Sequence, residues 1–317
     1  MGLIVLASGL GLDLILGDPQ GWPHPVRGLG WVIDRGRGFI LARGWTARGQ
    51  KGAGLTLALL LVGCCWLAAA LVLAGLEALW PPLAWLAGAW MIWSSLSLKD
   101  LLVHVRSVLE SLLSGRIYLA RKRLGLVVGR RTAELDQTGL TRASLETLAE
   151  NLSDGVVAPL FFIILGGPAA GLAYKAVNTL DSMVGYLHPP FTHLGFWPAK
   201  LDDLVNWLPA RLTFLLIVAG AALQGLDPKG AFKVSLAEHN KSSSPNAGWP
   251  EAALAGGLGV SLLGPAVYGG ELVDKPFINA QARPPESSDL QAGLSLVRTS
   301  GLLAYGLGLA AAAAVSI

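Results

Sequence analysis

The stretch between Glu146 and Ser182 decides how this chain folds: it reads ETLAENLSDGVVAPLFFIILGGPAAGLAYKAVNTLDS. A cluster of acids and amides opens it, and a second polar cluster closes it. Between the two lies an apolar run that prolines and glycines interrupt. Ionisable groups beside an apolar run of this kind are costly in a membrane, so we expect them to be functional.

The chain as a whole is as apolar as this run suggests. Of its 317 residues, 53% are hydrophobic and only 14% are charged, whereas a soluble domain carries about 25% charged residues. This composition predicts an all-α fold, a polytopic integral membrane helical bundle with discontinuous or re-entrant segments and cytoplasmic amphipathic helices. The net charge is only +3 and the basic residues lie mostly in two loops, which indicates membrane topology and argues against nucleic-acid binding.

The clearest transmembrane helix is expected over residues 53–79. Pro81 and Pro82 should turn the chain, so that residues 83–98 return as the second half of a helical hairpin. Other apolar segments, several of them short, are expected at residues 1–16, 156–173, 211–226, 252–268 and 300–317. The tryptophans of the hairpin are either interfacial anchors or packed in the bundle: Trp80, Trp85, Trp90 and Trp93.

Residues 99–151 form the longest polar region. Apolar residues recur there at spacings of three and four, which predicts amphipathic helices: Leu101, Val105, Val108 and Leu112. We interpret this region as a polar cytoplasmic insertion in a single membrane-embedded catalytic domain that comprises residues 1–317.

The topology of residues 156–173 is the main difficulty. The basic region at residues 27–51 should face the cytoplasm. If residues 156–173 crossed the membrane completely, the two flanking polar clusters would lie on opposite sides. Irregular segments are tolerated at membrane depth where they line a protein cavity. We therefore predict a re-entrant or discontinuous segment that brings both clusters to one cytoplasm-facing site.

Three acids of the first cluster share one helix face, because Glu146, Glu150 and Asp154 are spaced by four residues. Carboxylates so placed repel one another and favour a cationic partner. Mg²⁺ suits them, since it binds a few carboxylates and completes its shell with phosphate and water. A solvated acidic face is the alternative.

The second cluster presents Lys175, Asn178 and Ser182 on one helix face, with Asp181 adjacent. A lysine beside amide and hydroxyl groups suits a phosphate or carboxylate ligand. The alternative is a polar contact between helices of the bundle.

Further candidates lie outside these clusters. Lys200 and Arg211 bound a third polar patch, KLDDLVNWLPAR. His24 lies between prolines in PHPVR, just before Arg27, and either makes a structural hydrogen bond or contacts a ligand.

The loop AEHNKSSSPNAGWPEAAL, residues 237–254, precedes a helix expected to begin near Trp249. Helix N-termini bind anions through their N–H groups and the helix dipole, which makes Ser244 and Asn246 candidate phosphate contacts. His239 is a candidate general base or phosphate contact. Glu251 is either functional or a charge that favours the helix dipole.

These motifs, in this order, resemble the adenosylcobinamide-phosphate synthase family, the CbiB/CobD membrane proteins of cobalamin biosynthesis. The matching stretches are GDPQGWPHPVRGLG, ETLAENLSDGVVAPLFF, YKAVNTLDSMVGY, KLDDLVNWLPARLT and SPNAGWPEAALAGGLG. Each of them is long enough to be specific, and together they are spread along the chain from residue 17 to residue 259.

The resemblance implies a multi-pass protein of the cell (inner) membrane that acts as an ATP-dependent, amide-forming ligase. Its substrates would be the corrinoid adenosylcobyric acid and (R)-1-aminopropan-2-ol or its O-phosphate. The product would be adenosylcobinamide (phosphate), with the new amide at the f propionate of ring D. Activation of that carboxylate as an acyl phosphate suits Mg²⁺ and ATP as cofactors. Expected partners are membrane lipid and other membrane enzymes of the cobalamin pathway, and no nucleic acid.

The expected roles follow from the chemistry of the residue types. Catalytic roles are assigned to Glu150, Asp154, Lys175, His239 and Glu251. Substrate- or phosphate-binding roles are assigned to His24, Arg27, Asn151, Asn178, Ser182, Lys200, Arg211, Ser244 and Asn246. The expected Mg²⁺ ligands are Glu150, Asp154 and Asp181. Either His239 or Glu251 would deprotonate the attacking ammonium.

Two stretches depart from the family pattern. Arg130, Arg131 and Thr132 stand where Arg-Asp-Thr is expected, which argues against an acidic role there. The segment after Lys275, PFINAQARPPESS, fits the family only loosely.

Two other classes of function fit the composition. Broken helices with polar residues also build the substrate sites of transporters, so a corrinoid transporter is one alternative. A membrane scaffold for the enzymes of the cobalamin pathway is the other.

Overall fold

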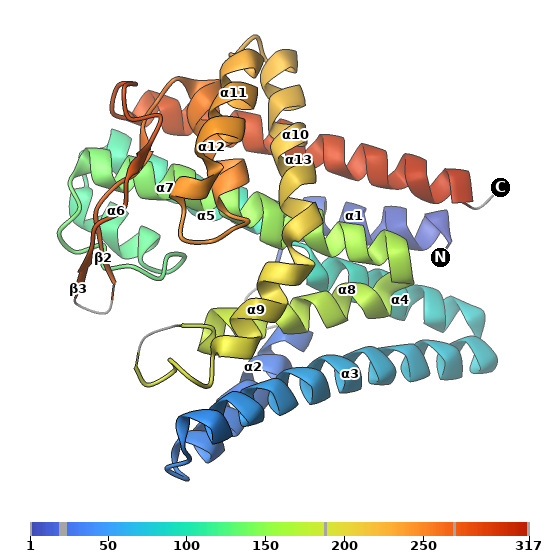
Figure 1. The fold of residues 1–317 in the computed structure, drawn as a ribbon. Coiled ribbons are helices and arrows are strands. Elements are labelled where there is room, and N and C mark those ends of the chain that lie inside the picture. Colours follow the sequence, from blue (N-terminus) through green and yellow to red (C-terminus); the bar gives the residue numbers. More distant parts are fainter. Residues whose placement is uncertain (1, 19–23, 187–188, 269–270, 316–317) are drawn as a thin grey trace. The chain divides into compact units, whose positions relative to one another are not determined.

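Helices make up nearly all of the regular structure in the computed structural model, which describes residues 2–18, 24–186, 189–268 and 271–315 (Figure 1). Part of the GDPQGWPHPVRGLG motif, residues 19–23, lies outside the described residues. The α-helices are α1 (Leu3–Leu16), α2 (Pro25–Leu41), α3 (Ala47–Leu79), α4 (Pro81–Ser95), α5 (Leu98–Leu113), α6 (Ile117–Leu124), α7 (Gln137–Leu152), α8 (Ala158–Val184), α9 (Phe196–Val205), α10 (Trp207–Leu223), α11 (Pro228–Glu238), α12 (Gly248–Leu258) and α13 (Ser287–Val315). The prediction of an all-α protein is confirmed.

The chain divides into two compact units, each assembled from segments that are far apart in the sequence. Unit 1 consists of Met1–Ser97, Ala158–Asn206 and Leu307–Ile317, and unit 2 consists of Leu98–Val157 and Trp207–Gly306. We describe each unit by itself. That the two together act as one catalytic domain stays a prediction.

Unit 1 is built around α3, which packs against α2, α4, α8 and α9. Ile33 of α2, Ala58 of α3 and Leu180 of α8 belong to one buried apolar cluster. Gly54 of α3 approaches the carbonyl of Leu194 so closely that a Cβ would not fit there. Small residues of this kind allow the helices of a membrane bundle to approach one another.

The tryptophans of the predicted hairpin have two different environments. Trp80, Trp85 and Trp90 are exposed, as interfacial anchors would be. Trp93 is buried, and its indole Nε1 donates a hydrogen bond to the carbonyl of Gly17 at 2.7 Å. For Trp93, packing inside the bundle is therefore the correct interpretation.

Helix α8 reverses its direction at Gly166 and Gly167, where the backbone is not helical and Gly167 has φ +73°. A residue with a Cβ is strained in that left-handed region, and Pro168 then starts a new helical segment. The ring centroids of Phe162 and Tyr174 lie only 5.3 Å apart, whereas twelve residues of straight helix would separate them by about 18 Å. The two arms therefore fold back on each other, as Figure 1 shows, and the prediction of a discontinuous segment is confirmed.

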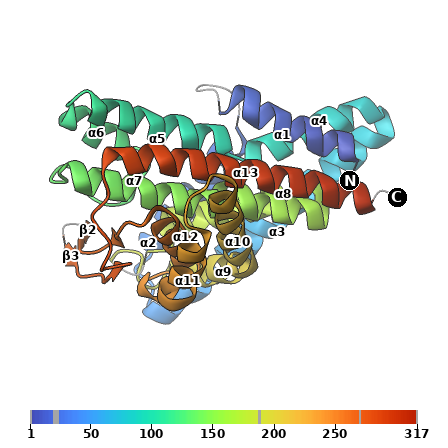
Figure 2. The ribbon, with the colours of Figure 1, turned by 90° about the horizontal axis from the view of Figure 1, so that it is seen from above.

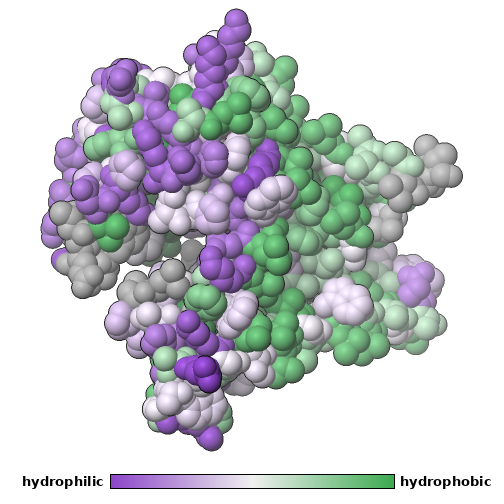
Figure 3. Space-filling view, viewed as in Figure 1, coloured by the Kyte–Doolittle hydropathy of each residue, from purple (hydrophilic) through white to green (hydrophobic). Residues whose placement is uncertain are grey.

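By length and composition, three helical stretches of the described residues could cross a membrane: Ala47–Leu79, Gln137–Val184 and Ser287–Ala314. A fourth arises if α9 and α10 are counted as one bent span, and the apolar α1 has only 14 residues. The second stretch is not one straight span, because it contains the reversal in α8. Figure 3 shows hydrophilic residues around the beginning of α3 and mainly hydrophobic residues along its middle.

Unit 2 contains the helices predicted for the polar insertion, α5, α6 and α7. The periodic residues Leu101, Val105, Val108 and Leu112 are all buried, which confirms the amphipathic pattern. Helices α10, α11 and α12 pack side by side (Figures 1 and 2). The backbones of α11 and α12 come close at Gly230 and Gly256, where a side chain would collide with the facing helix.

The apolar segment expected at residues 252–268 is not one helix. Helix α12 ends at Leu258, because Gly259 takes the left-handed conformation with φ +65°. Short strands follow: β1 (Leu262–Leu263) pairs antiparallel with β4 (Phe277–Ile278), and β2 (Ala266–Tyr268) pairs antiparallel with β3 (Glu271–Val273). The run is apolar because the protein interior covers it: Leu254, Val260 and Leu262 are completely buried.

Candidate functional site

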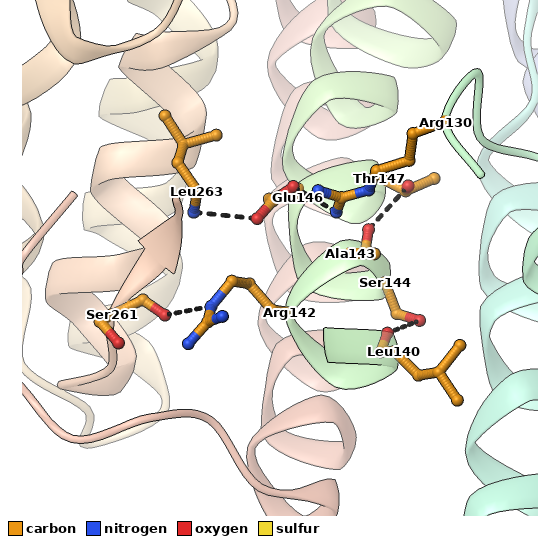
Figure 4. A network of polar contacts seen from close by, with 9 residues as sticks. All are labelled: Arg130, Leu140, Arg142, Ala143, Ser144, Glu146, Thr147, Ser261 and Leu263. Atoms are coloured by element: carbon orange, nitrogen blue, oxygen red, sulfur yellow. Dashed lines mark hydrogen bonds and ion pairs between the residues drawn. The ribbon is translucent and has the colours of Figure 1, made fainter. Parts of the chain in front are cut away.

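Glu146 of α7 is the most firmly held acid of the predicted site (Figure 4). Its Oε2 accepts from Nη2 of Arg130 at 2.5 Å, and its Oε1 accepts from the backbone N–H of Leu263 at 2.9 Å. The side chains of Arg130 and Glu146 are only 10% and 9% exposed. A buried carboxylate with a charged partner and a second donor is satisfied, so Glu146 organises the site and is not available to a metal ion.

The donor Leu263 has an unusual backbone conformation, with φ 59°. A leucine in this left-handed region is strained, because its Cβ approaches the following carbonyl oxygen. Strained residues of this kind persist where the surrounding structure fixes them, often at functional sites. Leu263 has this backbone conformation and also donates its backbone N–H to Glu146.

A second arginine, Arg142, lies one turn before Glu146 on α7. Its Nε donates to the carbonyl of Ser261 at 3.3 Å, and its guanidinium lies 4.9 Å from the ring centre of Phe277. Arg142 thus ties α7 to the strands that follow α12. The two arginines, one from α7 and one from the loop before it, lie on either side of Glu146 (Figure 4).

Glu251, in the first turn of α12, is an acid whose pKa is raised by burial. Its side chain is buried, and its Oε2 has no hydrogen-bond partner among the described residues. Burial, and after it the carboxylates of Glu146 and Glu150, raise the pKa of Glu251 to about 8, against the opposing effects of a hydrogen bond from Ser242 and the charge of Lys275. The acid of the SPNAGWPE motif is therefore not a solvated helix-dipole charge. It forms an acidic cluster with Glu146 and Glu150, and Glu150 is the exposed member.

Trp249 is the centre of a stack at the beginning of α12. The ring of His239 stacks on its indole at 3.9 Å with an interplanar angle of 20°. The guanidinium of Arg211 lies 5.0 Å from the ring centre of Trp249, and its Nη1 donates to Oδ1 of Asn246 at 3.1 Å. Three of the predicted residues, Arg211, His239 and Asn246, are thus brought together around one aromatic ring.

Ser244 makes structural hydrogen bonds in the loop before α12. Its Oγ accepts from the backbone N–H groups of Asn246 and Ala247, both at 3.2 Å. It therefore satisfies donors in the turn that leads into α12, as capping hydroxyls do. His239 is also fixed, because its Nδ1 lies 2.9 Å from the carbonyl of Ser235. A carbonyl only accepts, so Nδ1 carries the proton and Nε2 is left as the basic nitrogen.

The second polar cluster lies on the returning arm of α8, in unit 1. Lys175, Asn178 and Asp181 are partly buried there. The hydroxyl of Ser182 is exposed and donates to the carbonyl of Asn178 at 2.8 Å. Nearby, the hydroxyl of Tyr174 donates to Oδ1 of Asn206 at 2.9 Å, so part of this arm is held by a polar contact with α9.

Three further predicted residues of unit 1 lie at the surface or in structural contacts. Nδ1 of His24 accepts from the N–H of Val26 at 3.3 Å and caps α2, as the structural alternative anticipated. Arg27 is exposed on the first turns of α2. Lys200 forms an exposed ion pair with Asp203 at 3.2 Å. In unit 2, the side-chain amide of Asn151 donates to the carbonyl of Thr147 at 3.0 Å.

The two polar clusters fall in different units: Glu150, Asn151 and Asp154 in unit 2, and the cluster on α8 in unit 1. That they serve one site stays a prediction. Among the described residues, no three His, Cys, Asp or Glu side chains are placed to hold a metal ion. Mg²⁺ is commonly held by one or two carboxylates together with substrate phosphate. The exposed Glu150 and the partly buried Asp154, one turn apart, fit such an ion once a phosphate is bound.

Sequence reasoning missed three residues of this site. Arg130 was noted only as part of a departure from the family pattern, and its pairing with Glu146 depends on a loop whose path the sequence does not reveal. Trp249 lay inside a quoted motif, and its tryptophan-histidine-arginine stack has no fixed sequence spacing. Lys275, whose charge acts on Glu251, lies in a segment that fits the family pattern only loosely.

Fold and site together define a polytopic α-helical membrane protein with an internal site of acids, arginines and stacked aromatic rings. The family described as CobD/Cbib protein matches residues 6–297. The chain is 43% identical over 293 residues to the cobalamin biosynthesis protein CobD of Yersinia enterocolitica, with 92% of each chain covered. It is 40% identical to CobD of Streptococcus sanguinis and 39% identical to the cobalamin biosynthesis protein CbiB of Salmonella typhimurium, with 97% and 96% of each chain covered. No solved structure matches. The chain belongs to the CobD/CbiB family of cobalamin biosynthesis proteins.

Proposed function

We propose that this protein is an amide-forming ligase of the cell membrane. In this reaction the f carboxylate of adenosylcobyric acid is joined to the amine of (R)-1-aminopropan-2-ol or of its O-phosphate, at the expense of ATP. Family membership supports a role in cobalamin biosynthesis. The observation that carries the proposal is the grouping, within unit 2, of anion-binding and proton-accepting groups at the beginning of α12.

The anion-binding part consists of Arg211, Asn246 and the N-terminus of α12. Arg211 is oriented by its contacts with Trp249 and Asn246. Helix N-termini and arginines both stabilise phosphate oxygens, and such groups act most strongly where they are fixed in advance. They would hold a phosphate of the amino alcohol or of the activated carboxylate.

The proton-accepting part contains Glu251 and His239. An amine attacks a carbonyl only after its ammonium has lost a proton, and a base is most effective when its pKa lies near the working pH. Burial brings Glu251 into this range, with a pKa of about 8. His239 offers Nε2 because its Nδ1 is bound to Ser235. Glu251 is our assignment for the base, since its Oε2 has no hydrogen-bond partner in the part of the chain that the structure describes.

The reaction balances in two steps. A carboxylate oxygen of the corrinoid takes the terminal phosphoryl group of ATP and releases ADP. The amine nitrogen then forms a bond to the acyl carbon, the bond from carbon to the phosphate oxygen breaks and releases phosphate, and the amine proton passes to the ionised carboxylate of Glu251. When bound, Mg²⁺ would neutralise phosphate charge, and Glu150 and Asp154 are the residues that would hold it. A cytoplasmic opening of this site is part of the proposal, because nucleotide and substrates are there.

The test is a turnover assay with purified protein, adenosylcobyric acid, amino alcohol phosphate and Mg-ATP, read by mass spectrometry of the amide. We expect product from the unaltered chain. General acid–base catalysis contributes about 10²–10⁴-fold, so Glu251→Gln should lower kcat by about 100-fold or more. Glu134→Gln is the matched control, since Glu134 is 76% exposed. No product, together with corrinoid uptake into proteoliposomes, would refute the ligase proposal in favour of a transporter.

A further inference from the structure

Helix α2 and the turn after it carry a repeating pattern that the proposed function does not use. Arg27, Trp31, Arg35, Phe39 and Arg43 follow one another at intervals of four residues. We call these five residues the arginine-aromatic ladder. Residues four apart are neighbours on a helix surface, so the ladder lies along one side of α2.

The structure places the ladder on the outside of unit 1. Ile33 and Ile40, on the opposite side of α2, are buried. Trp31 and Phe39 are 61% and 56% exposed. The exposed aromatic residues are therefore not needed to pack α2 against its neighbours.

Two arginines of the ladder, Arg35 and Arg43, are stacked on its aromatic rings. The guanidinium of Arg35 lies 4.9 Å from the ring centre of Trp31, and that of Arg43 lies 4.1 Å from the ring centre of Phe39. Cation–π contacts of this kind position a guanidinium without neutralising its charge. The N–H groups of such an arginine remain able to bind phosphate oxygens bidentately.

The positive charge of α2 and of the segment after it is not balanced by carboxylates in the same stretch of sequence. Residues 24–51 contain six basic residues and a single acid, Asp34. Asp34 is taken by Arg37, at 2.5 Å. Among the described residues, Arg35, Arg43 and Arg48 form no ion pair. The ladder therefore offers positive charge to a partner outside the protein.

The position of the ladder identifies that partner. Helix α3 begins at Ala47, only a few residues after Arg43, and is apolar enough to cross a membrane. Gly36 of α2 lies against Leu57 of α3, so α2 rests on the first turns of this span. Arginine and aromatic side chains at the end of a span lie at the level of the lipid headgroups.

We propose that the arginine-aromatic ladder binds the headgroups of anionic phospholipids. Arg35 and Arg43 contact the phosphates, and Trp31 and Phe39 lie in the interfacial layer between them. A polybasic segment beside a membrane span is attracted to anionic lipid by about 1 kcal/mol per arginine. This site is independent of the acid-rich site in unit 2.

The experiment is lipid binding by the full chain in nanodiscs made of phosphatidylcholine with a minor share of phosphatidylglycerol. Native mass spectrometry of the released protein counts the phosphatidylglycerol that remains bound. Replacing both Arg35 and Arg43 by Gln should weaken retention by up to about 30-fold, since about 1 kcal/mol per charge amounts to that ratio. The control is Lys229→Gln with Lys233→Gln, two exposed cations of α11. This control changes the net charge equally and should leave retention unchanged.

A second measurement separates lipid contact from loss of folding. Trp31→Phe should remove part of the fluorescence quenching by brominated phosphatidylglycerol, while circular dichroism remains unchanged. Equal retention by the ladder variant and the unaltered chain would overturn the proposal, as would equal losses in both double variants. Equal preference of the unaltered chain for phosphatidylcholine would also overturn it. Binding of a soluble acidic protein or nucleic acid, without lipid preference, would assign the ladder to a different partner and refute it.

Discussion

Replacing Arg130 by Met should destabilise unit 2, because it leaves the carboxylate of Glu146 buried without its charged partner. The ion pair joins Nη2 and Oε2 at 2.5 Å, and both side chains are about nine-tenths covered. Glu146 would keep one contact, the N–H of Leu263 at 2.9 Å. The substitution therefore tests what a single buried ion pair contributes to the site.

The magnitude follows from the distance and the burial. At an effective dielectric constant of about 20, two unit charges at 2.5 Å attract each other by about 7 kcal/mol. Desolvation of both groups offsets most of that attraction. Removal of one partner of a buried pair costs about 3–5 kcal/mol. Because Leu263 still donates to Glu146, we expect the lower limit, about 3 kcal/mol.

The neighbouring residue supplies a matched control. Arg131 also pairs with a glutamate, Glu134, but at 3.7 Å and with side chains 58% and 76% exposed. An exposed pair contributes about 0–1 kcal/mol, so Arg131→Met should cost about 0.5 kcal/mol or less. The assay is equilibrium unfolding in mixed micelles titrated with sodium dodecyl sulfate, followed by circular dichroism.

A double variant separates the stranded charge from other effects of the substitution. Arg130→Met combined with Glu146→Gln leaves no buried charge, and it should regain about 1–2 kcal/mol relative to Arg130→Met alone. If Arg130→Met and Arg131→Met lost the same amount of stability, burial of the ion pair would not explain the effect, and the prediction would be refuted. A double variant whose cost equals the sum of the two single variants would refute it as well.

Three further predictions concern other parts of the fold. Gly248→Ala should lower the free energy of unfolding by about 3 kcal/mol or more, because its Cβ would overlap a backbone carbonyl. Gly28→Ala has open space around it and should be neutral or slightly stabilising in the same unfolding assay. The Glu251 pKa of about 8 exceeds the ordinary value of 4.5, so the contribution of Glu251 to stability should be largest below about pH 4.5 and be lost as the pH rises to about 8. Glu251→Gln should abolish this loss, which amounts to at most about 5 kcal/mol, in unfolding titrations at several pH values. Trp93→Phe should lower the free energy of unfolding by about 1–2 kcal/mol, because the buried hydrogen bond of the indole is lost. Replacing the exposed Trp85 by Phe should lower it by about 0.5 kcal/mol in the same titration.

Local sequence signals predicted those features of the fold that depend on local physics. The reversal of α8 was predictable because a glycine pair followed by Pro168 cannot continue a helix without interruption. The amphipathic helices of residues 98–152 were predictable because their apolar residues keep the helical period. Both signals lie within a few residues of the structure they produce.

Hydropathy alone misled where apolar residues are covered by protein. Residues 252–268 resemble a membrane segment in composition, but Gly259 ends the helix and strands complete the run. Trp93 resembles its exposed neighbours in sequence and is nevertheless buried. The hydropathy of an apolar residue is the same whether lipid or protein surrounds it. Only the packing in the folded structure distinguishes a lipid-facing residue from a buried one.

The site itself was predictable in its residue types and not in its partners. Arg211, His239, Asn246 and Glu251 were identified from charge and position relative to a helix start, and the structure places all four around α12. The pairing of Arg130 with Glu146 depends on how a loop returns to α7. Long-range contacts of this kind have no local signal.

The division of the chain between the two units has a consequence for its synthesis. The ribosome makes most of unit 1 early, yet Leu307–Ile317 belongs to that unit as well. Gly308 lies there against Leu160 and Ile164, both of the outgoing arm of α8. Unit 1 therefore cannot be completed during translation until residues 307–317 have been made. A nascent chain stalled before residue 307 would lack the contact that Gly308 makes with α8.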